Sequence, residues 1–281
     1  MRQSFLNHIR TSNIDGSNKA ESYIRAIDKL GAIIGSNHPV LGGCLDIWRV
    51  DSEDKLHELY EFTKAQQQMG EAGLFKGTDS PSYWRNGFYS SAVKAYAQFV
   101  ALRHREYQML TAFESTSDGA FLTSKLVSIE FNCEPLFLDD MIAVSSREGR
   151  DVIGLVKSRQ NQDVFRKMIL DIYNGSCCVT GLTVPEVLRS SHIIPWAENS
   201  ETRMNPENGL CLSATYDAAF DKHLISFDED YRMILAPSLD EYCENRAFQE
   251  SFKKKKGCKM ALPSKFFPSQ EFLANHREHL K

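Results

Sequence analysis

The sequence lacks a long apolar run, and no stretch approaches the roughly 18 apolar residues that a membrane-spanning helix needs. The first residues, MRQSFLNHIRTSN, show no apolar stretch of the kind found in signal peptides, so we expect a cytoplasmic protein. Internal repeats and low-complexity tracts are also missing. With 42% hydrophobic and 25% charged residues among 281, the chain is typical of a globular protein of one or two domains.

Paired cysteine motifs are missing as well. The seven cysteines are odd in number and none has C-x-x-C spacing, which argues against a disulfide framework. Cys177 and Cys178 are adjacent, a poor arrangement for placing both sulfurs on one tetrahedral zinc. We therefore expect no structural zinc, and cysteines that mostly serve as small buried hydrophobic residues.

The sequence also lacks an excess of positive charge. The chain has 33 basic and 37 acidic residues, a net charge of -4, so nucleic-acid binding would have to depend on local patches. One such patch is FKKKKGCK, with Lys253, Lys254, Lys255 and Lys256 in a row. Lysine runs are commonly solvated loops, whereas contact with phosphates would make binding salt-dependent.

The first 115 residues show the three- and four-residue apolar spacing of amphipathic helices, and we predict a helical N-terminal domain over residues 1–115. Ser17 is placed to cap one helix and Ser52 a second, and SSAVKAYAQFVALRH predicts a third. The Gly-rich stretch MGEAGLFKGTDSPSYWRNG predicts a loop between the second and the third. Expected inward-facing residues are Ala20, Tyr23, Ile24, Ile27 and Leu30, then Leu56, Leu59, Tyr60 and Phe62, then Ala92, Val93, Tyr96, Phe99 and Val100.

The segment SYWRNGFY combines Arg85 with four aromatic side chains: Tyr83, Trp84, Phe88 and Tyr89. Such clusters can stack nucleic-acid bases. A corner where helices pack is the alternative interpretation, and we favour it.

We predict a linker over residues 116–149. The stretch ESTSDGAFLTS, residues 114–124, indicates where it starts, and short strands are predicted to follow in LVSIEF and DMIAVSS. A helix over residues 162–173 follows, with Phe165, Ile169 and Ile172 inward and Asn174-Gly175 as its stop. Short strands, loops and one short helix come next, and we predict a second domain over residues 150–281.

The stretch RSSHIIPWAENS places His192 at the end of a short β-branched run, just before a proline and a loop. Ser213 is well placed to cap a helix through ATYDAAFD, in which Asp217 and Asp221 are four residues apart and share a face. Two like charges at that spacing destabilise a helix by a few tenths of a kcal/mol. A hard divalent cation with oxygen ligands would offset this cost.

SSHIIPW followed by NPENGLCLSATYDAAFD resembles the ββα-metal motif of HNH endonucleases, and is most similar to the branch found in restriction-type proteins. FRKMILDIYNGSCCVTG and LPSKFFPSQEFLANHREHLK also resemble that branch, so that the resemblance covers about residues 150–281. It implies an α+β fold, in which a helical N-terminal region precedes a C-terminal HNH nuclease domain.

Carried over by position, the resemblance makes His192 the general base and Asn208 the middle residue of the motif, both counted as catalytic. Asp217 matches a metal ligand, and Asp221 a second ligand or a phosphate-side group. The amide of Asn208 can hold the hairpin loop or orient His192. His223 and the four lysines, Lys253 to Lys256, are candidates for phosphate contact.

Two residues depart from the family pattern. Many relatives carry an acidic residue or histidine directly before the base as a metal ligand, where this chain has Ser191. Tyr216 stands where similar sequences have a histidine, and we interpret it as a packing residue. With Ser191, water or the substrate phosphate must complete the metal's ligands.

The resemblance implies hydrolysis of a DNA phosphodiester with a divalent metal, with Mg²⁺ expected ahead of Mn²⁺ or Ni²⁺. Neutral imidazole has a pKa near 6.5 and can take a proton from water. We expect double-stranded DNA as substrate, a bacterial restriction or defence role, target recognition or assembly by the N-terminal region, and a homodimer for a double-strand break. The alternatives are an inactive HNH-fold protein that binds DNA or regulates, and a non-specific nuclease toxin.

Overall fold

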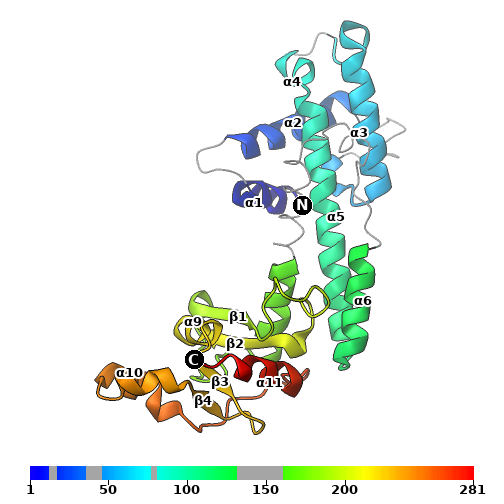
Figure 1. Cartoon of the computed structure of the whole chain (residues 1–281). Coiled ribbons are helices and arrows are strands. Elements are labelled where there is room, and N and C mark those ends of the chain that lie inside the picture. The colour runs from blue at the N-terminus through cyan, green and yellow to red at the C-terminus, as the bar shows by residue number, and fades with distance from the viewer. Residues whose placement is uncertain (13–17, 36–45, 77–80, 132–160) are drawn as a thin grey trace. The chain divides into compact units, whose positions relative to one another are not determined.

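The computed structural model describes residues 1–12, 18–35, 46–76, 81–131 and 161–281 (Figure 1). The described residues fall into two compact units, residues 1–105 and residues 106–131 with 161–281. The boundary lies inside one long helix, α5 (Phe88–Glu114), rather than after residue 115 as predicted. The predicted domain start at residue 150 lies outside the described residues.

The first unit is helical. It contains α1 (Arg2–Ser12), α2 (Lys19–Ile34), α3 (Glu53–Gln68), α4 (Pro81–Arg85), the first part of α5 and two 3₁₀ turns, η2 (Ile47–Arg49) and η3 (Gly70–Ala72). The three predicted helices are confirmed, and the inward positions are buried except Tyr23 and Phe62, which are partly buried. Ser52 caps α3, because its Oγ accepts a hydrogen bond from the Lys55 amide at 3.4 Å. Ser17 lies outside the described residues.

The prediction of a loop between the second and third helices is partly wrong. Both η3 and α4 lie within it, and residues 77–80 fall outside the description. Trp84 is buried, and the Tyr83 ring lies 5.7 Å from Phe88 and 5.6 Å from Tyr89, centre to centre. These aromatic residues therefore form a packing corner, which is the interpretation that the sequence favoured.

The strand predicted in LVSIEF is also wrong, because this segment belongs to α6 (Gly119–Phe131). Leu122 and Leu126, one turn apart, are both fully buried. A short apolar run fits either a strand or one buried turn of a helix. Here the burial of residues one helical turn apart favours the helix. The segment DMIAVSS lies outside the described residues.

Residues 161–172 form the predicted helix, which ends at Asn174 (φ 51°) and Gly175 (φ 61°). Phe165, Ile169 and Ile172 are fully buried on its inner face. Of the described cysteines, Cys177, Cys178 and Cys211 are buried as expected, whereas Cys243 is half-buried and Cys258 is exposed. Burial raises the pKa of Cys211 to about 12. The buried side chains belong to the core of the second unit.

A hairpin and a helix follow in the order strand, strand, helix. Strands β1 (Leu188–His192) and β2 (Gly209–Ser213) pair antiparallel, with Ser191 opposite Leu210 and His192 opposite Gly209, and α9 (Ala214–Asp221) packs on both (Figure 1). A Cβ atom on Gly209 would lie 2.2 Å from Ile169 Cδ1, so only glycine lets the hairpin approach the helix over residues 161–172 this closely. Ser213 precedes α9 as predicted, but its side chain makes no capping hydrogen bond.

The second unit continues with short elements. These are β3 (Ile225–Phe227), β4 (Met233–Leu235), α10 (Arg246–Ser251) and α11 (Gln270–Glu278). The 3₁₀ turns are η4 (Pro185–Val187), η5 (Pro206–Asn208), η6 (Pro237–Tyr242) and η7 (Lys253–Lys255). Within the ranges described, no helix is long and apolar enough to cross a membrane.

Candidate active site

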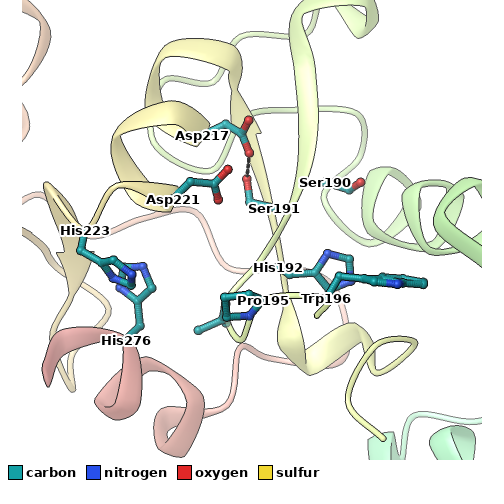
Figure 2. Close-up of a pocket in the computed structure, with 10 residues that line it drawn as sticks. Ser190, Ser191, His192, Pro195, Trp196, Asp217, Asp221, His223 and His276 are labelled. Atoms are coloured by element: carbon teal, nitrogen blue, oxygen red, sulfur yellow. Dashed lines mark hydrogen bonds between the residues drawn. The ribbon is translucent and has the colours of Figure 1, made fainter. Parts of the chain in front are cut away.

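A cavity of about 350 Å³ opens where β1 and the loop after it face α9 and α11 (Figure 2). Its lining includes four of the predicted site residues, namely His192, Asp217, Asp221 and His223. Asn208 and the four lysines do not line it. The cavity therefore brings together the predicted base, both predicted metal ligands and one predicted phosphate contact.

The acid side of the cavity is formed by α9 and Ser191. Asp217 and Asp221 lie one helical turn apart, and both carboxylates face the cavity with Ser191 beside them (Figure 2). The Ser191 hydroxyl donates a hydrogen bond to Asp217 Oδ1. Loss of solvation raises the pKa of Asp221, the Asp217 charge raises it further, and His223 opposes the shift. The two carboxylates thus repel each other where a cation would stabilise both.

His192 lies on the other side of β1. Successive side chains of a strand point to opposite faces, so His192 turns away from Ser191 and Asp217 (Figure 2). Its ring stacks on Phe165, with 3.9 Å between ring centres and 15° between planes, and meets the edge of Trp196 at 5.3 Å. The ring is therefore held on two sides by aromatic packing.

The hydrogen bond of His192 determines which nitrogen can accept a proton. Nε2 donates to the Arg203 carbonyl oxygen at 2.9 Å, so the lone pair of the neutral ring lies on Nδ1. Burial lowers the pKa of His192 from 6.5, and the bond to Arg203 partly opposes that shift. The imidazole is accordingly neutral at physiological pH, as a general base must be.

Asn208 is fully buried and bonds to backbone groups of the hairpin loop. Its Oδ1 accepts from the Ile194 amide at 2.7 Å, while Nδ2 donates to the Ile194 and Thr202 carbonyl oxygens at 3.1 and 3.2 Å. Thr202 precedes Arg203, whose carbonyl oxygen holds His192. Of the two roles considered for Asn208, holding the loop is the direct one, and His192 is oriented through it.

Three histidines lie close together, and two of them line the cavity. The His223 ring centre lies 4.4 Å from that of His276 and 5.4 Å from that of His279, and both His223 and His276 line the cavity (Figure 2). His223 has φ 55°, and its buried Nδ1 has no hydrogen-bond partner among the described residues. A strained backbone and an unsatisfied nitrogen are more common at functional positions than elsewhere.

His276 was not singled out from the sequence. Its Nε2 donates to the Phe220 carbonyl oxygen at 3.1 Å and its Nδ1 accepts from the Ser226 hydroxyl at 3.0 Å, so it is held neutral. Burial lowers its pKa to about 4, and the neighbouring His223 adds to that shift. The only sequence signal was its place four residues after Phe272 in a short amphipathic stretch, which indicates burial rather than a site.

The four lysines lie outside the cavity. Three of them form η7, and Lys254 pairs with Glu250 at 2.6 Å. Tyr216 is a packing residue as predicted, because it is buried and its ring lies 5.2 Å from that of Phe252.

The oxygen atoms on the acid side suit a hard divalent cation. Asp217, Asp221 and the Ser191 hydroxyl supply such donors, and Mg²⁺ is commonly bound through one or two carboxylates plus water and substrate phosphate. No group of three or more His, Cys, Asp or Glu side chains that could hold a metal occurs among the described residues. The residues thus fit a cation whose other ligands come from water and phosphate, as Ser191 led us to expect.

Residues 177–228 match the model of a family described as HNH endonuclease. No curated protein matches the chain. The matched segment contains His192, Asn208, Asp217, Asp221 and His223, and it spans the strand, strand, helix arrangement described above. The predicted α+β class is confirmed, and the predicted resemblance is confirmed over residues 177–228. This segment is therefore similar to the family described as HNH endonuclease.

Proposed function

We propose that the protein is a metal-dependent endonuclease that hydrolyses phosphodiester bonds of double-stranded DNA. The observation that supports this most is a cavity that holds a neutral imidazole at one side of β1 and paired carboxylates at the other. A nucleophilic water needs a base, and the scissile phosphate needs neutralisation, so the two sides supply the two requirements of the reaction.

His192 acts as the general base. Its Nδ1 takes a proton from water, the water oxygen attacks phosphorus, and the bond from phosphorus to the 3′ oxygen breaks. The leaving oxygen takes a proton from solvent, so that the products are a 5′-phosphate and a 3′-hydroxyl. Contact with Phe165 and the hydrogen bond to the Arg203 carbonyl oxygen keep the ring oriented for this transfer.

Asp217 and Asp221 would hold the cation, with the Ser191 hydroxyl fixing the orientation of Asp217. The bound cation supplies stabilisation of the negative charge that develops on the phosphate and the leaving oxygen. We propose Mg²⁺ as that ion, with Mn²⁺ or Ni²⁺ as substitutes. His223, on the same rim as Asp221, contacts a phosphate oxygen.

Asn208 serves catalysis as a positioning residue. By tying Ile194 to Thr202 it fixes the loop that carries the Arg203 carbonyl oxygen, and so the tautomer of His192. We further propose a restriction or defence role in the cytoplasm, with a homodimer for cuts in both strands and target recognition or assembly by the helical unit.

A second candidate function is DNA binding without catalysis. Ser191 favours this second candidate. Its hydroxyl donates a hydrogen bond to one Asp217 oxygen, whereas an acidic residue at position 191 would add a charged metal ligand. Calorimetric titration with Mg²⁺ or Mn²⁺ separates the candidates: the nuclease binds metal and loses that binding in the Asp217→Asn variant, whereas an inactive fold shows no Asp217-dependent binding.

The proposed function is tested by incubating the intact protein and its His192→Ala variant with unmodified plasmid and with base-modified phage DNA. Each reaction contains Mg²⁺, Mn²⁺ or EDTA. We expect cleavage by the intact protein alone, and only with metal. Discrete bands on one DNA would support a restriction role, and a smear on both would contradict it. Cleavage by neither protein, or equally by both, would overturn the proposal.

A further inference from the structure

The most basic segment of the chain lies outside the cavity. Residues 246–259 contain six basic side chains and one acidic one, in a chain with net charge -4. We name residues Lys253 to Lys256 the lysine turn. Lys253, Lys254 and Lys256 are exposed and Lys255 is half-buried. Lys254 pairs with Glu250, whereas the structure shows no ion pair in its described part for the other three.

The lysine turn is anchored to α9 at its beginning. The Tyr216 hydroxyl donates to the Ser251 carbonyl oxygen, two residues before the turn. The Tyr216 ring also packs on Phe252, with 5.2 Å between ring centres, and Phe252 stacks on Phe248 of α10. Tyr216 directly precedes Asp217 in the chain, so this contact joins the turn to the helix that carries both carboxylates.

A second anchor holds the end of the turn against β4. The Gly257 amide donates to the Met233 carbonyl oxygen at 2.8 Å, and the Met233 amide donates to the Cys258 carbonyl oxygen at 3.0 Å. Arg232 adds a hydrogen bond from its guanidinium to the Gly257 carbonyl oxygen at 3.0 Å. A solvated lysine loop needs no such anchors, whereas a binding surface gains affinity when it is ordered before the ligand arrives.

We propose that the lysine turn binds backbone phosphates of the duplex DNA whose scissile bond lies in the cavity, and that Tyr216 is the residue that positions it. This inference rests on the proposed function and adds a binding surface to it. Lys253, Lys255 and Lys256 bind the phosphates, since their charges are not shared with a carboxylate. Tyr216 acts through the turn and touches no DNA.

The first test is the salt dependence of binding, measured by fluorescence anisotropy of a labelled 30-base-pair duplex in EDTA, where no cleavage occurs. The triple variant Lys253→Ala, Lys255→Ala, Lys256→Ala should bind about tenfold or more weakly, with a log–log salt slope shallower by about 0.9 for each phosphate that is no longer neutralised. A matched control removes the same charge from three exposed lysines elsewhere: Lys55→Ala, Lys76→Ala, Lys125→Ala. Equal slopes for the two triple variants would overturn the proposal.

The second test concerns Tyr216. The Tyr216→Phe variant keeps the ring packing and removes only the hydrogen bond to Ser251, so it should fold and bind the duplex about threefold more weakly with a shallower salt slope. Combined with the triple lysine variant it should cause no further drop in affinity, because the two act through one surface. An additive drop, or a lower melting temperature with unchanged binding, would make Tyr216 a residue of stability alone.

The two proposals fail separately. If the protein cleaves plasmid but the triple lysine variant binds like its control, the nuclease assignment stands and the lysine turn is wrong. If binding depends on the lysine turn but no metal supports cleavage, the proposed DNA-binding role of the lysine turn is supported and the nuclease assignment is wrong. If the intact protein binds no duplex DNA, the proposed role of the lysine turn is wrong.

Discussion

The two sides of strand β1 differ in how the protein holds functional groups. On one side, Ser191 donates a hydrogen bond to Asp217, while loss of solvation and the neighbouring Asp217 charge raise the pKa of Asp221. On the other side, the His192 ring packs against aromatic rings and donates a hydrogen bond to a backbone carbonyl oxygen. These contacts fix its orientation without any ligand. The comparison indicates that the acid side needs a bound cation to offset the charge of its carboxylates, whereas the His192 ring is already held in one orientation.

The largest expected effect comes from removing the acid side. The Asp217→Asn variant should lose about 10³-fold or more in cleavage rate, because several kcal/mol of transition-state stabilisation depend on the cation. Plasmid nicking under single-turnover conditions measures this, and Asp171→Asn, on the exposed face of the helix over residues 161–172, is the control. A tenfold decrease or less would mean that Asp217 is no ligand.

The imidazole side should contribute somewhat less. We expect His192→Ala to lower the rate about 10²- to 10⁴-fold and free imidazole to restore part of it, with His57→Ala as control. Because the pKa of His192 is lowered, the ring stays neutral to lower pH, and the acid limb of kcat/KM should lie below pH 6.5. An acid limb above pH 7 would contradict the assignment.

The loop that supports the imidazole side is the next target. Asn208→Ala leaves the amide and the carbonyl oxygen of Ile194 without partners and removes one of the two hydrogen bonds to the Thr202 carbonyl oxygen, so it should lower the free energy of unfolding by about 2–3 kcal/mol. Chemical denaturation measures this against the exposed Asn275→Ala control. If Asn208→Ala abolished cleavage without loss of stability, Asn208 would itself contact the substrate.

The last prediction concerns His276, which borders the acid side and to which we assign no part in the reaction; its effect is the smallest at neutral pH and grows only as the pH falls. Its pKa is near 4 in the folded protein and higher in the unfolded chain, so the unfolded state binds more protons between these values. Its contribution to stability is complete above pH 6.5 and should fall, by up to about 3 kcal/mol, as pH drops toward 4. Denaturation of His276→Gln should show a flatter dependence over this range, and an unchanged dependence would exclude His276 as its source.

The resemblance to HNH endonucleases, supported by the spacing of His192, Asn208 and Asp217, predicted a hairpin followed by a helix, and the structure contains both. Contacts distant in sequence were not predictable, and these decided what Asn208, Tyr216 and His276 do. The bond from Tyr216 to Ser251 crosses 35 residues, and neither end carries a local motif. The strand predicted in LVSIEF was wrong for the same reason, because packing against distant residues favours a helix there.

The most direct test of the central claim compares single-turnover nicking of plasmid by the intact protein, His192→Ala, Asp217→Asn and the double variant, with Mg²⁺ and at one pH. If both sides of β1 act on one phosphodiester, each single variant is strongly impaired and the double variant is little slower than the worse single one. Rapid, metal-dependent nicking by either single variant would contradict the account.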